Sequence, residues 1–151
     1  MLNIPVSIEH IGSTAVPGLA AKPIIDIDIV FENSPDFISI KNRLEETGYF
    51  HNGNQDISGR DVFKRNHTVT KHIVLDNIIH HLYVCSVNSE ELRRHLLFRN
   101  YLRAEPEARN EYQQLKLHLA NKANHNRKLY AQLKEEHAKA FIEGILIKAM
   151  K

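Results

Sequence analysis

The spacing of hydrophobic and polar residues changes character near residue 88. Before that point, short apolar runs are separated by Gly, Pro, Asn and Asp, a pattern typical of strands joined by turns. After it, apolar residues recur every three or four positions to the end of the chain, which indicates helices. The pattern predicts one domain over residues 1–151, with a sheet half of about 1–87 and a helical half of about 88–151.

The first half predicts strands at Ile4–Ile11, Ile24–Val30, a short stretch after Tyr49, Arg60–Arg65 and Ile78–Val84. Pro5 favours an edge position for the first of them. Two interpretations of Arg60–Arg65 stay open: an edge strand guarded by charge, or a strand that places Arg60 beside a triphosphate. The apolar runs Val69–Leu75 and Ile78–Val84 flank Asp76-Asn77, which predicts a tight hairpin.

Helices are expected where a capping residue precedes apolar residues that recur at helical spacing. Asn33-Ser34-Pro35 begins one that Gly48 ends. In the second half we expect a helix from the cap at Asn88–Glu91 to Arg103 and another from Glu105-Pro106. After Asn124-His125-Asn126, a last helix carries apolar residues toward the core, namely Leu129, Leu133, Phe141, Ile145 and Leu146.

The strand Ile24–Val30 carries two carboxylates on one side. Strand side chains alternate, so Asp26 and Asp28 share one face, roughly 6.6 Å apart along the strand. Such a spacing can bracket one or two divalent ions, and two adjacent carboxylates are costly to hold together without a cation. The alternative is an exposed face with two solvated acids.

A turn of small residues, Gly12-Ser13, follows the first predicted strand. Its backbone N–H groups and hydroxyl can cradle an anion, because a glycine lets the backbone approach a phosphate closely. Lys22, just ahead of the Asp strand, would either reach a substrate phosphate or be a solvated loop lysine. The sequence therefore combines a phosphate cradle with a candidate metal pair.

A Gly-Ser turn followed by Asp-x-Asp on the next strand is similar to the signature of the nucleotidyltransferase superfamily. The fuller string HIGSTAVPGLAAKPIIDI resembles the GrpB (UPF0157) family. The resemblance extends to Ile57–Phe63, His80–Val84, His95–Arg103 and Glu111–Lys116. It implies an α/β (α+β) fold, a nucleotidyltransferase-like mixed β-sheet with flanking helices and a helical C-terminal half. GrpB-like segments fused to dephospho-CoA kinase imply nucleotide or coenzyme A chemistry.

The same resemblance implies roles for single residues. Asp26 and Asp28 would hold Mg²⁺, and Gly12 and Ser13 would seat the outer phosphates. His81 would stand near the third ligand position, where the superfamily usually has a carboxylate and where residues 78–87 of this chain contain no Asp or Glu.

Basic candidates for the phosphates are Lys22, Arg60 and Arg99. Arg99 shares a helix stripe with His95 and Arg103, and this stripe either faces the Asp strand or faces water. A zinc site at His10, His80 and His81 matches no standard ligand spacing.

Composition and charge limit the classes of binding partner and the compartment that the sequence indicates. A net charge of +2 in 151 residues does not indicate nucleic acid or an anionic membrane as the main partner. The single Cys85 fits a reducing compartment and predicts a buried structural thiol. Without a signal peptide or an apolar run of membrane length, the expectation is a cytoplasmic protein.

The function expected is Mg²⁺-dependent transfer of a nucleotidyl group from a nucleoside triphosphate to an acceptor, in a cleft between the two halves. The first alternative is a non-catalytic module that binds a nucleotide, coenzyme A or another phosphorylated small molecule. The second is a partner subunit or homo-oligomer whose sheet edge pairs with another chain. Members of the family usually have a segment before the first strand, so this chain is expected to be a short member, a truncated product or a late start.

Overall fold

The computed structural model describes residues 3–66, 68 and 70–151. The chain divides into two compact units, each described here by itself. The sheet unit comprises Met1–Ala15 and Ala21–His95, and the helical unit comprises Val16–Ala20 and Leu96–Lys151. The short segment Val16–Ala20, which lies within the predicted sheet half, therefore packs with the helices.

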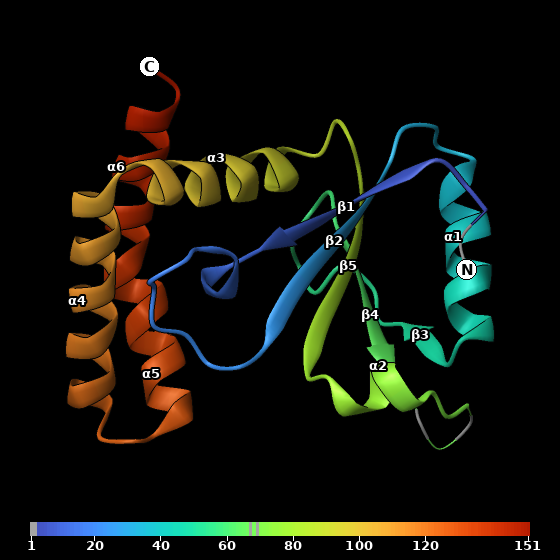
Figure 1. The fold of residues 1–151 in the computed structure, drawn as a ribbon, viewed down its shortest axis with the longest axis horizontal. Helices are drawn as coiled ribbons and strands as arrows, with labels where there is room; N and C mark the ends of the chain where they lie inside the picture. Colours follow the sequence, from blue (N-terminus) through green and yellow to red (C-terminus); the bar gives the residue numbers. More distant parts are fainter. Residues whose placement is uncertain (1–2, 67, 69) are drawn as a thin grey trace. The chain divides into compact units, whose positions relative to one another are not determined.

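The sheet unit contains a mixed five-stranded sheet in the order β1-β2-β5-β4-β3 (Figure 1). The strands are β1 (Val6–Ile11), β2 (Ile25–Phe31), β3 (Tyr49–His51), β4 (Asp61–Arg65) and β5 (His80–Ser86). β2 and β5 are parallel, and the other neighbouring pairs are antiparallel. β1 lies at an edge, as Pro5 predicts, whereas β4 lies inside the sheet. The interpretation of Arg60–Arg65 as an edge strand is wrong, because β3 and β5 pair with both sides of β4.

Helix α1 (Asp36–Glu46) covers one face of this sheet, which we call the core face (Figure 1). Ile40 and Leu44 of α1 pack against strand residues that point to the core face, among them Ile29, Phe31, Phe63, Leu82 and Val84. The helix ends at Glu46 with Thr47 as its C-cap, so Gly48 (φ +97°), the predicted C-cap, lies one residue further on. Its start differs from the prediction, because Pro35 occupies the N-cap and no side-chain cap is formed; instead the Asp36 N–H donates to the Asn33 carbonyl.

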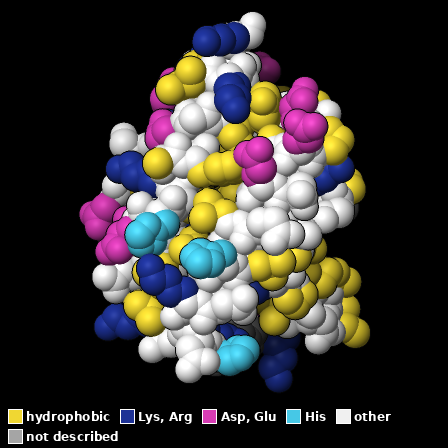
Figure 2. All heavy atoms as spheres, turned by 90° about the vertical axis from the view of Figure 1, so that its left-hand side faces the viewer, with side chains coloured by type: hydrophobic (Ala, Val, Ile, Leu, Met, Phe, Trp, Pro, Cys, Tyr) yellow, Lys and Arg dark blue, Asp and Glu magenta, His cyan; other side chains and the backbone are white. Residues whose placement is uncertain are grey.

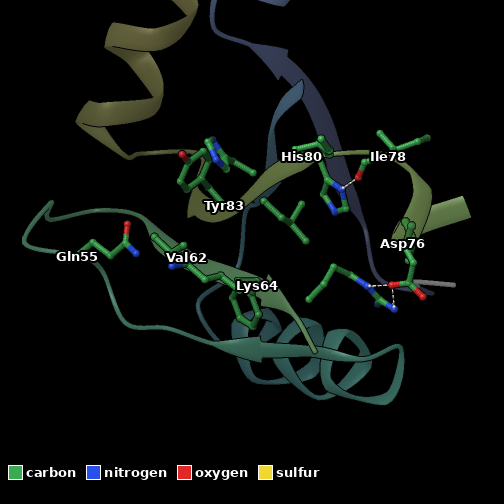
Figure 3. A pocket seen from close by; sticks show the side chains of 13 residues that line it. Gln55, Val62, Lys64, Asp76, Ile78, His80 and Tyr83 are labelled. Atoms are coloured by element: carbon green, nitrogen blue, oxygen red, sulfur yellow. Dashed lines mark hydrogen bonds and ion pairs between the residues drawn. The ribbon is translucent and has the colours of Figure 1, made fainter. Parts of the chain in front are cut away.

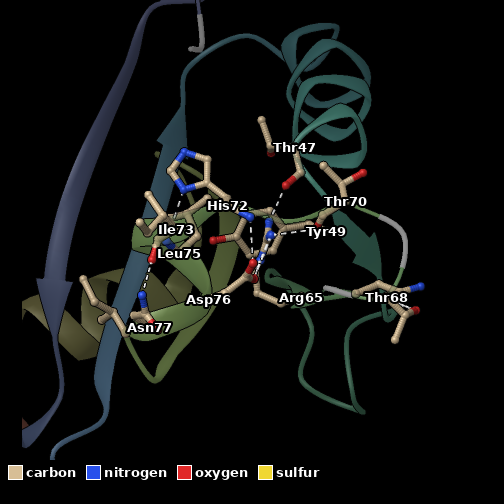
Figure 4. Close-up of polar contacts among 12 residues, drawn as sticks. Thr47, Tyr49, Arg65, Thr68, Thr70, His72, Ile73, Leu75, Asp76 and Asn77 are labelled. Atoms are coloured by element: carbon tan, nitrogen blue, oxygen red, sulfur yellow. Dashed lines mark hydrogen bonds and ion pairs between the residues drawn. The ribbon is translucent and has the colours of Figure 1, made fainter.

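The predicted hairpin around Asp76-Asn77 is wrong. Ile73–Asn77 forms a short helix, α2, which begins where the His72 ring accepts a hydrogen bond from the Leu75 N–H. Asp76 also binds the guanidinium of Arg65, whose other donors reach the carbonyls of Thr47 and Thr70 (Figure 4). Asp76 thus links α2 to Arg65 at the end of β4. Val69, where the first predicted run begins, lies outside the described residues.

Helix α3 (Glu90–Ala104) begins after Ser89, whose hydroxyl accepts from the Leu92 N–H. α4 (Pro106–Ala123) follows, with Pro106 in its first turn and Asn124 in the left-handed conformation (φ +48°) at its end. The predicted last helix is interrupted: α5 (Arg127–Leu133) passes through a π-helical turn, Lys134–Ala138, into α6 (Lys139–Ala149). A π-helical turn adds a residue to one helical turn, and it shifts the register of the apolar stripe.

The helical unit has its own core. Leu102 and Tyr112 pack with Val16, Leu19 and Ile145 in one cluster. A second cluster joins residues of α4 and the last helices, namely Leu119, Ala123, Leu133 and Ala138. Figure 2 faces the side of the structure that carries α4–α6, and basic and acidic side chains are scattered over it among hydrophobic atoms. Among the described residues, no helix has the length and apolar content needed to span a membrane. The predicted α/β fold with a helical C-terminal half is confirmed.

Candidate functional site

The turn after β1 packs directly against the first carboxylate of β2. Ile11 pairs with Asp26 across the two strands, and Gly12 follows with a φ of +75°. A Cβ built on Gly12 would lie 2.5 Å from Oδ2 of Asp26, closer than real Cβ atoms approach a neighbour. Glycine is therefore required here for both backbone conformation and space. Next comes a single 3₁₀ turn, η1 (Ser13–Ala15), shorter than the helix a phosphate cradle usually opens.

Both predicted carboxylates lie on the sheet face opposite the core face. This carboxylate face carries Asp26 and Asp28 on β2 and, directly beside them on β5, His81 and Tyr83. The Asp28 side chain is 2% exposed, so the alternative of two solvated acids is wrong for this residue. Asp26 is half-buried at the end of the strand near Gly12.

Each carboxylate faces an imidazole. Nδ1 of His81 lies 2.9 Å from Oδ1 of Asp26, and Nδ1 of His95 lies 3.4 Å from Oδ2 of Asp28. Because an ionised carboxylate only accepts hydrogen bonds, these nitrogens are the donors. The opposite ring nitrogen of His95 lies 3.0 Å from a carboxylate oxygen of Glu91, one turn earlier in α3. The His95 ring thus links Asp28 to Glu91.

Arg60 reaches the carboxylate face through an aromatic contact. Its guanidinium carbon lies 4.4 Å from the centre of the Tyr83 ring, a cation–π geometry. Nε of Arg60 is buried and meets no acceptor among the described residues. Burial raises the pKa of the Tyr83 hydroxyl, with the negative charges of Asp26 and Asp28 adding to the rise and Arg60 opposing it.

Cys85 lies further along the same face, two residues after Tyr83 on β5. The residue is 3% exposed, as the sequence predicts for a structural thiol. Burial raises its pKa to about 12, with a further contribution from the charges of Asp28 and Asp61. A thiol with so high a pKa is almost entirely protonated at neutral pH, and it is therefore a poor nucleophile.

The remaining predicted residues are placed as follows. Ser13 begins η1 beside Gly12. Lys22 is exposed in the segment before β2, where its carbonyl accepts from the Ile24 N–H. Arg99 belongs to the helical unit, and so does Arg103, whereas His95 belongs to the sheet unit. The structure thus brings together Gly12, Ser13, Asp26, Asp28, Arg60 and His81, while the phosphate role of Arg99 and the cleft between the halves stay predictions.

No group of three or more His, Cys, Asp or Glu side chains is arranged to hold a metal in residues 3–66, 68 and 70–151. His10, His80 and His81, the ligands of the zinc alternative, do not form such a group either. Each of them has another partner, which for His81 is Asp26. His80 hydrogen-bonds to the Tyr49 hydroxyl (2.7 Å) and the Ile78 carbonyl, and His10 to the Thr14 hydroxyl (2.9 Å). A metal at Asp26 and Asp28 would take its other ligands from water or from a phosphate.

Two members of the site do not stand out as such in the sequence. Glu91 fits a helix cap and His95 a basic stripe, yet both extend the hydrogen-bonded chain from Asp28. The signal that could have found them is their own spacing. An acid four residues before a histidine on a helix makes a pair on one helix face.

The family model described as GrpB protein matches residues 1–145. The Glutamate-rich protein GrpB of Alkalihalophilus pseudofirmus is 37% identical over 142 residues, which cover 92% of this chain and 76% of that protein. UPF0157 protein YqkA of Bacillus subtilis is 34% identical over 92% of this chain, but the match spans only 38% of YqkA.

Among solved structures, the crystal structure of conserved protein GrpB from Enterococcus faecalis matches with a TM-score of 0.72 and 33% identity. The match covers 96% of this chain and 82% of that one. The similarity thus extends over both the sheet unit and the helical unit.

Proposed function

The chain belongs to the GrpB family, and we propose that it binds a nucleoside triphosphate with Mg²⁺ and transfers the nucleotidyl group to an acceptor. The observation that carries the proposal is the packing of the Gly12 turn against the Asp26 carboxylate. This contact puts a backbone that can cradle a phosphate next to a group that can hold the phosphate's counter-ion.

The donor set fits magnesium. Mg²⁺ prefers oxygen ligands, is held in proteins by one or two carboxylates, and keeps several waters or takes phosphate oxygens. Asp26 and Asp28 lie two residues apart on one strand face and supply the two carboxylates. Asp28 is deeply buried with His95 as its partner at 3.4 Å, and a cation would further offset the cost of keeping an ionised carboxylate out of water.

Each protein group has a separate task in this proposal. The turn at Gly12-Ser13 binds the outer phosphates through its backbone, and the buried Nε of Arg60 is a donor still without an acceptor in the described structure. His81 and His95 hold the two carboxylates in place through their Nδ1–H groups. When bound, Mg²⁺ would supply charge neutralisation at the phosphates.

The transfer itself is a displacement at the α-phosphorus. An acceptor oxygen or nitrogen forms the new bond, and the bond from the α-phosphorus to the bridging oxygen breaks. The electron pair of that bond leaves with pyrophosphate, and the acceptor's proton passes to solvent. The chain's contribution is to position the triphosphate and to stabilise its charge.

A non-catalytic binding module is the second candidate, and a specific observation favours it. The β5 positions beside Asp26 and Asp28 are His81 and Tyr83, where a third carboxylate would be expected for transfer chemistry. A module of this kind would keep the phosphate contacts without turnover.

Thermal unfolding tests the proposal. We would heat the wild-type protein and the double variant Asp26→Asn/Asp28→Asn with each nucleoside triphosphate and with coenzyme A, in the presence and absence of Mg²⁺. A ligand at a hundred times its Kd adds about 2.7 kcal/mol, which shifts the Tm of a chain this size by about 5–10 °C. We expect this shift with a nucleoside triphosphate, only with Mg²⁺, and only in the wild type.

Asp56→Asn is the matched control, because Asp56 is an exposed acid in a loop with a φ (+63°) that asparagine also tolerates. It should keep the full shift. A shift that is independent of Mg²⁺ and survives in the double variant would sink the catalytic proposal and leave the binding module. If stabilisation does require Mg²⁺, release of pyrophosphate in the presence of candidate acceptors separates transfer from binding.

A further inference from the structure

Strands β4 and β5 separate beside His81 and open a pocket. They pair only from Asp61↔Val84 to Phe63↔Leu82. Beyond that point Lys64 and Arg65 pair with β3, while His80 and His81 pair with β2. The gap between the diverging strands is a cavity of about 410 Å³, the fork pocket (Figure 3).

The fork pocket combines apolar walls with two polar side chains that have no partner among the described residues. Its apolar lining includes Val62, Leu75, Ile78, Ile79 and the Tyr83 ring. Arg65 and Asp76 form an ion pair at one end (Figure 3). The exposed side chains of Gln55 and Lys64, in contrast, make no hydrogen bond or ion pair within the described part of the chain. They are thus available to a ligand.

His81 joins the fork pocket to the candidate phosphate site. Its Nδ1–H donates to Asp26, its side chain is 56% exposed, and the residue belongs to the lining of the pocket. Ile11, Asp26 and His81 pair across β1, β2 and β5, and Gly12 follows Ile11 directly. Since neighbouring strands are about 4.8 Å apart, the backbone of His81, where the pocket begins, lies roughly 10 Å from the Gly12 turn. A ligand that fills both places has phosphates at one end and a planar or apolar group at the other.

We propose that the fork pocket takes the base of the nucleotide whose phosphates contact the Gly12 turn, and that His81 stacks on this base. The inference rests on the function proposed above and gives His81 a different role from that of a third metal ligand. A base is planar, and its faces suit the exposed imidazole ring. Its edge carries donors and acceptors, which Gln55 and Lys64 can pair with.

Three forms of residue 81 distinguish stacking from metal binding: wild type, His81→Phe and His81→Ala. Phenylalanine keeps an aromatic face but has no ligand nitrogen, and alanine has neither. We would measure the Kd of each form for Mg²⁺-tripolyphosphate and for the four Mg²⁺-nucleoside triphosphates by calorimetry. Both variants lose the hydrogen bond to Asp26, so the stack is measured between them: His81→Ala should bind the nucleotides about tenfold more weakly than His81→Phe, the usual effect of one base–aromatic stack. The Kd for tripolyphosphate should be similar in His81→Phe and His81→Ala, because both lose the same hydrogen bond to Asp26.

Tryptophan fluorescence locates the base independently, because the chain contains no Trp. Ile79, at the pocket, and Ile147, in α6, are 65% and 55% exposed, so both tolerate a larger side chain. Nucleoside triphosphates should quench Ile79→Trp and leave Ile147→Trp unchanged. Tripolyphosphate should quench neither. Lys64→Ala should weaken nucleotide binding about fivefold, the effect of one hydrogen bond, while Lys128→Ala, an exposed lysine of the helical unit, should not.

The outcomes separate this inference from the proposed function. If tripolyphosphate binds with Mg²⁺ and the nucleotides bind no more tightly, the phosphate site stands and the base pocket is wrong. If His81→Phe binds the nucleotides no more tightly than His81→Ala, the aromatic face contributes nothing and stacking is wrong. If neither tripolyphosphate nor any nucleotide binds, the proposed function fails, and this inference fails with it.

Discussion

The two faces of the β-sheet differ in composition although the same strands form both. On β2, Ile27, Ile29 and Phe31 point to the core face, where α1 covers them. Asp26 and Asp28 alternate with these residues and point to the opposite face. One strand thus supplies apolar packing to one side and paired carboxylates to the other. Adjacent residues of β2 therefore serve different purposes: one packs in the core, and the next belongs to the candidate site.

The separation is incomplete, because part of the carboxylate face is also buried. Val30 and Cys85 pair across β2 and β5 beyond the carboxylates, and both are almost inaccessible. Asp28 lies between this apolar part and the half-buried Asp26. The face therefore changes from packed to accessible toward the Gly12 turn.

Removal of a core-face side chain should have the largest effect on stability and none on the site. Ile29 is 4% exposed and lies next to Asp28 in the chain. Ile29→Ala should lower the free energy of unfolding by about 2–5 kcal/mol, because it removes buried methyl groups and leaves a cavity. Urea denaturation measures the loss, and the Kd for Mg²⁺-nucleotide should not change.

Ile8 provides the matched control, since it pairs with Ile29 across β1 and β2 but is 66% exposed. Ile8→Ala should change the free energy of unfolding by less than about 0.5 kcal/mol. An equal loss in both variants would contradict the distinction between a packed strand centre and an open edge. A loss of nucleotide affinity in Ile29→Ala would show that the faces are coupled.

The Gly12 turn should respond in both stability and binding. Gly12→Ala places a Cβ against the Asp26 carboxylate at a positive φ, and it should cost about 1–3 kcal/mol and abolish Mg²⁺-dependent stabilisation by nucleotides. Gly53→Ala is the control, because Gly53 has a similar φ (+68°) and open space where the alanine Cβ would lie. It should show the backbone strain alone, with ligand binding intact. Thermal unfolding with and without ligand measures both effects, and equal ligand shifts in the two variants would remove Gly12 from the site.

The ionisation of Cys85 should affect stability only at high pH. Its pKa in the folded protein is about 12, above the ordinary value of 9.0, so the folded protein holds this proton more tightly. The contribution to stability is present below pH 9 and is lost as the pH rises toward 12. Between these values Cys85→Ala should lose stability less steeply with pH than the wild type does. Parallel pH profiles in urea denaturation would contradict the raised pKa.

The predictions that succeed are local. Alternation in Ile24–Val30 predicts which side chains share a face, and the caps and periods of the helices predict most of their bounds. The sequence places Gly12-Ser13 and Asp26 in one site, and the structure brings Gly12 and Asp26 into direct contact. Each of these features depends on residues close in sequence or on neighbouring strands. Local steric rules are enough to specify them.

The predictions that fail depend on contacts between distant segments. Ile73–Asn77 belongs to a β-branched run that favours a strand, but the ion pair of Asp76 with Arg65, eleven residues earlier, accompanies a helix there. The charged residues of β4 favour an edge position, but β4 lies inside the sheet. The order of strands in a sheet depends on segments that are distant in the sequence. The spacing of apolar residues along a strand does not by itself specify which strands pair with it.

The family, the general pattern of strands and helices, the Gly-Ser turn and the placement of Asp26 and Asp28 on one strand face all follow from the order of amino acids alone. Three features of the site exist only in the folded chain: the burial of Asp28 beside His95, the contact of His81 with Asp26, and the separation of β4 from β5 that forms the fork pocket. Alternation and turn conformation follow from steric limits on adjacent residues. Burial and strand divergence follow instead from which distant segments share a layer, and packing of the whole unit settles that.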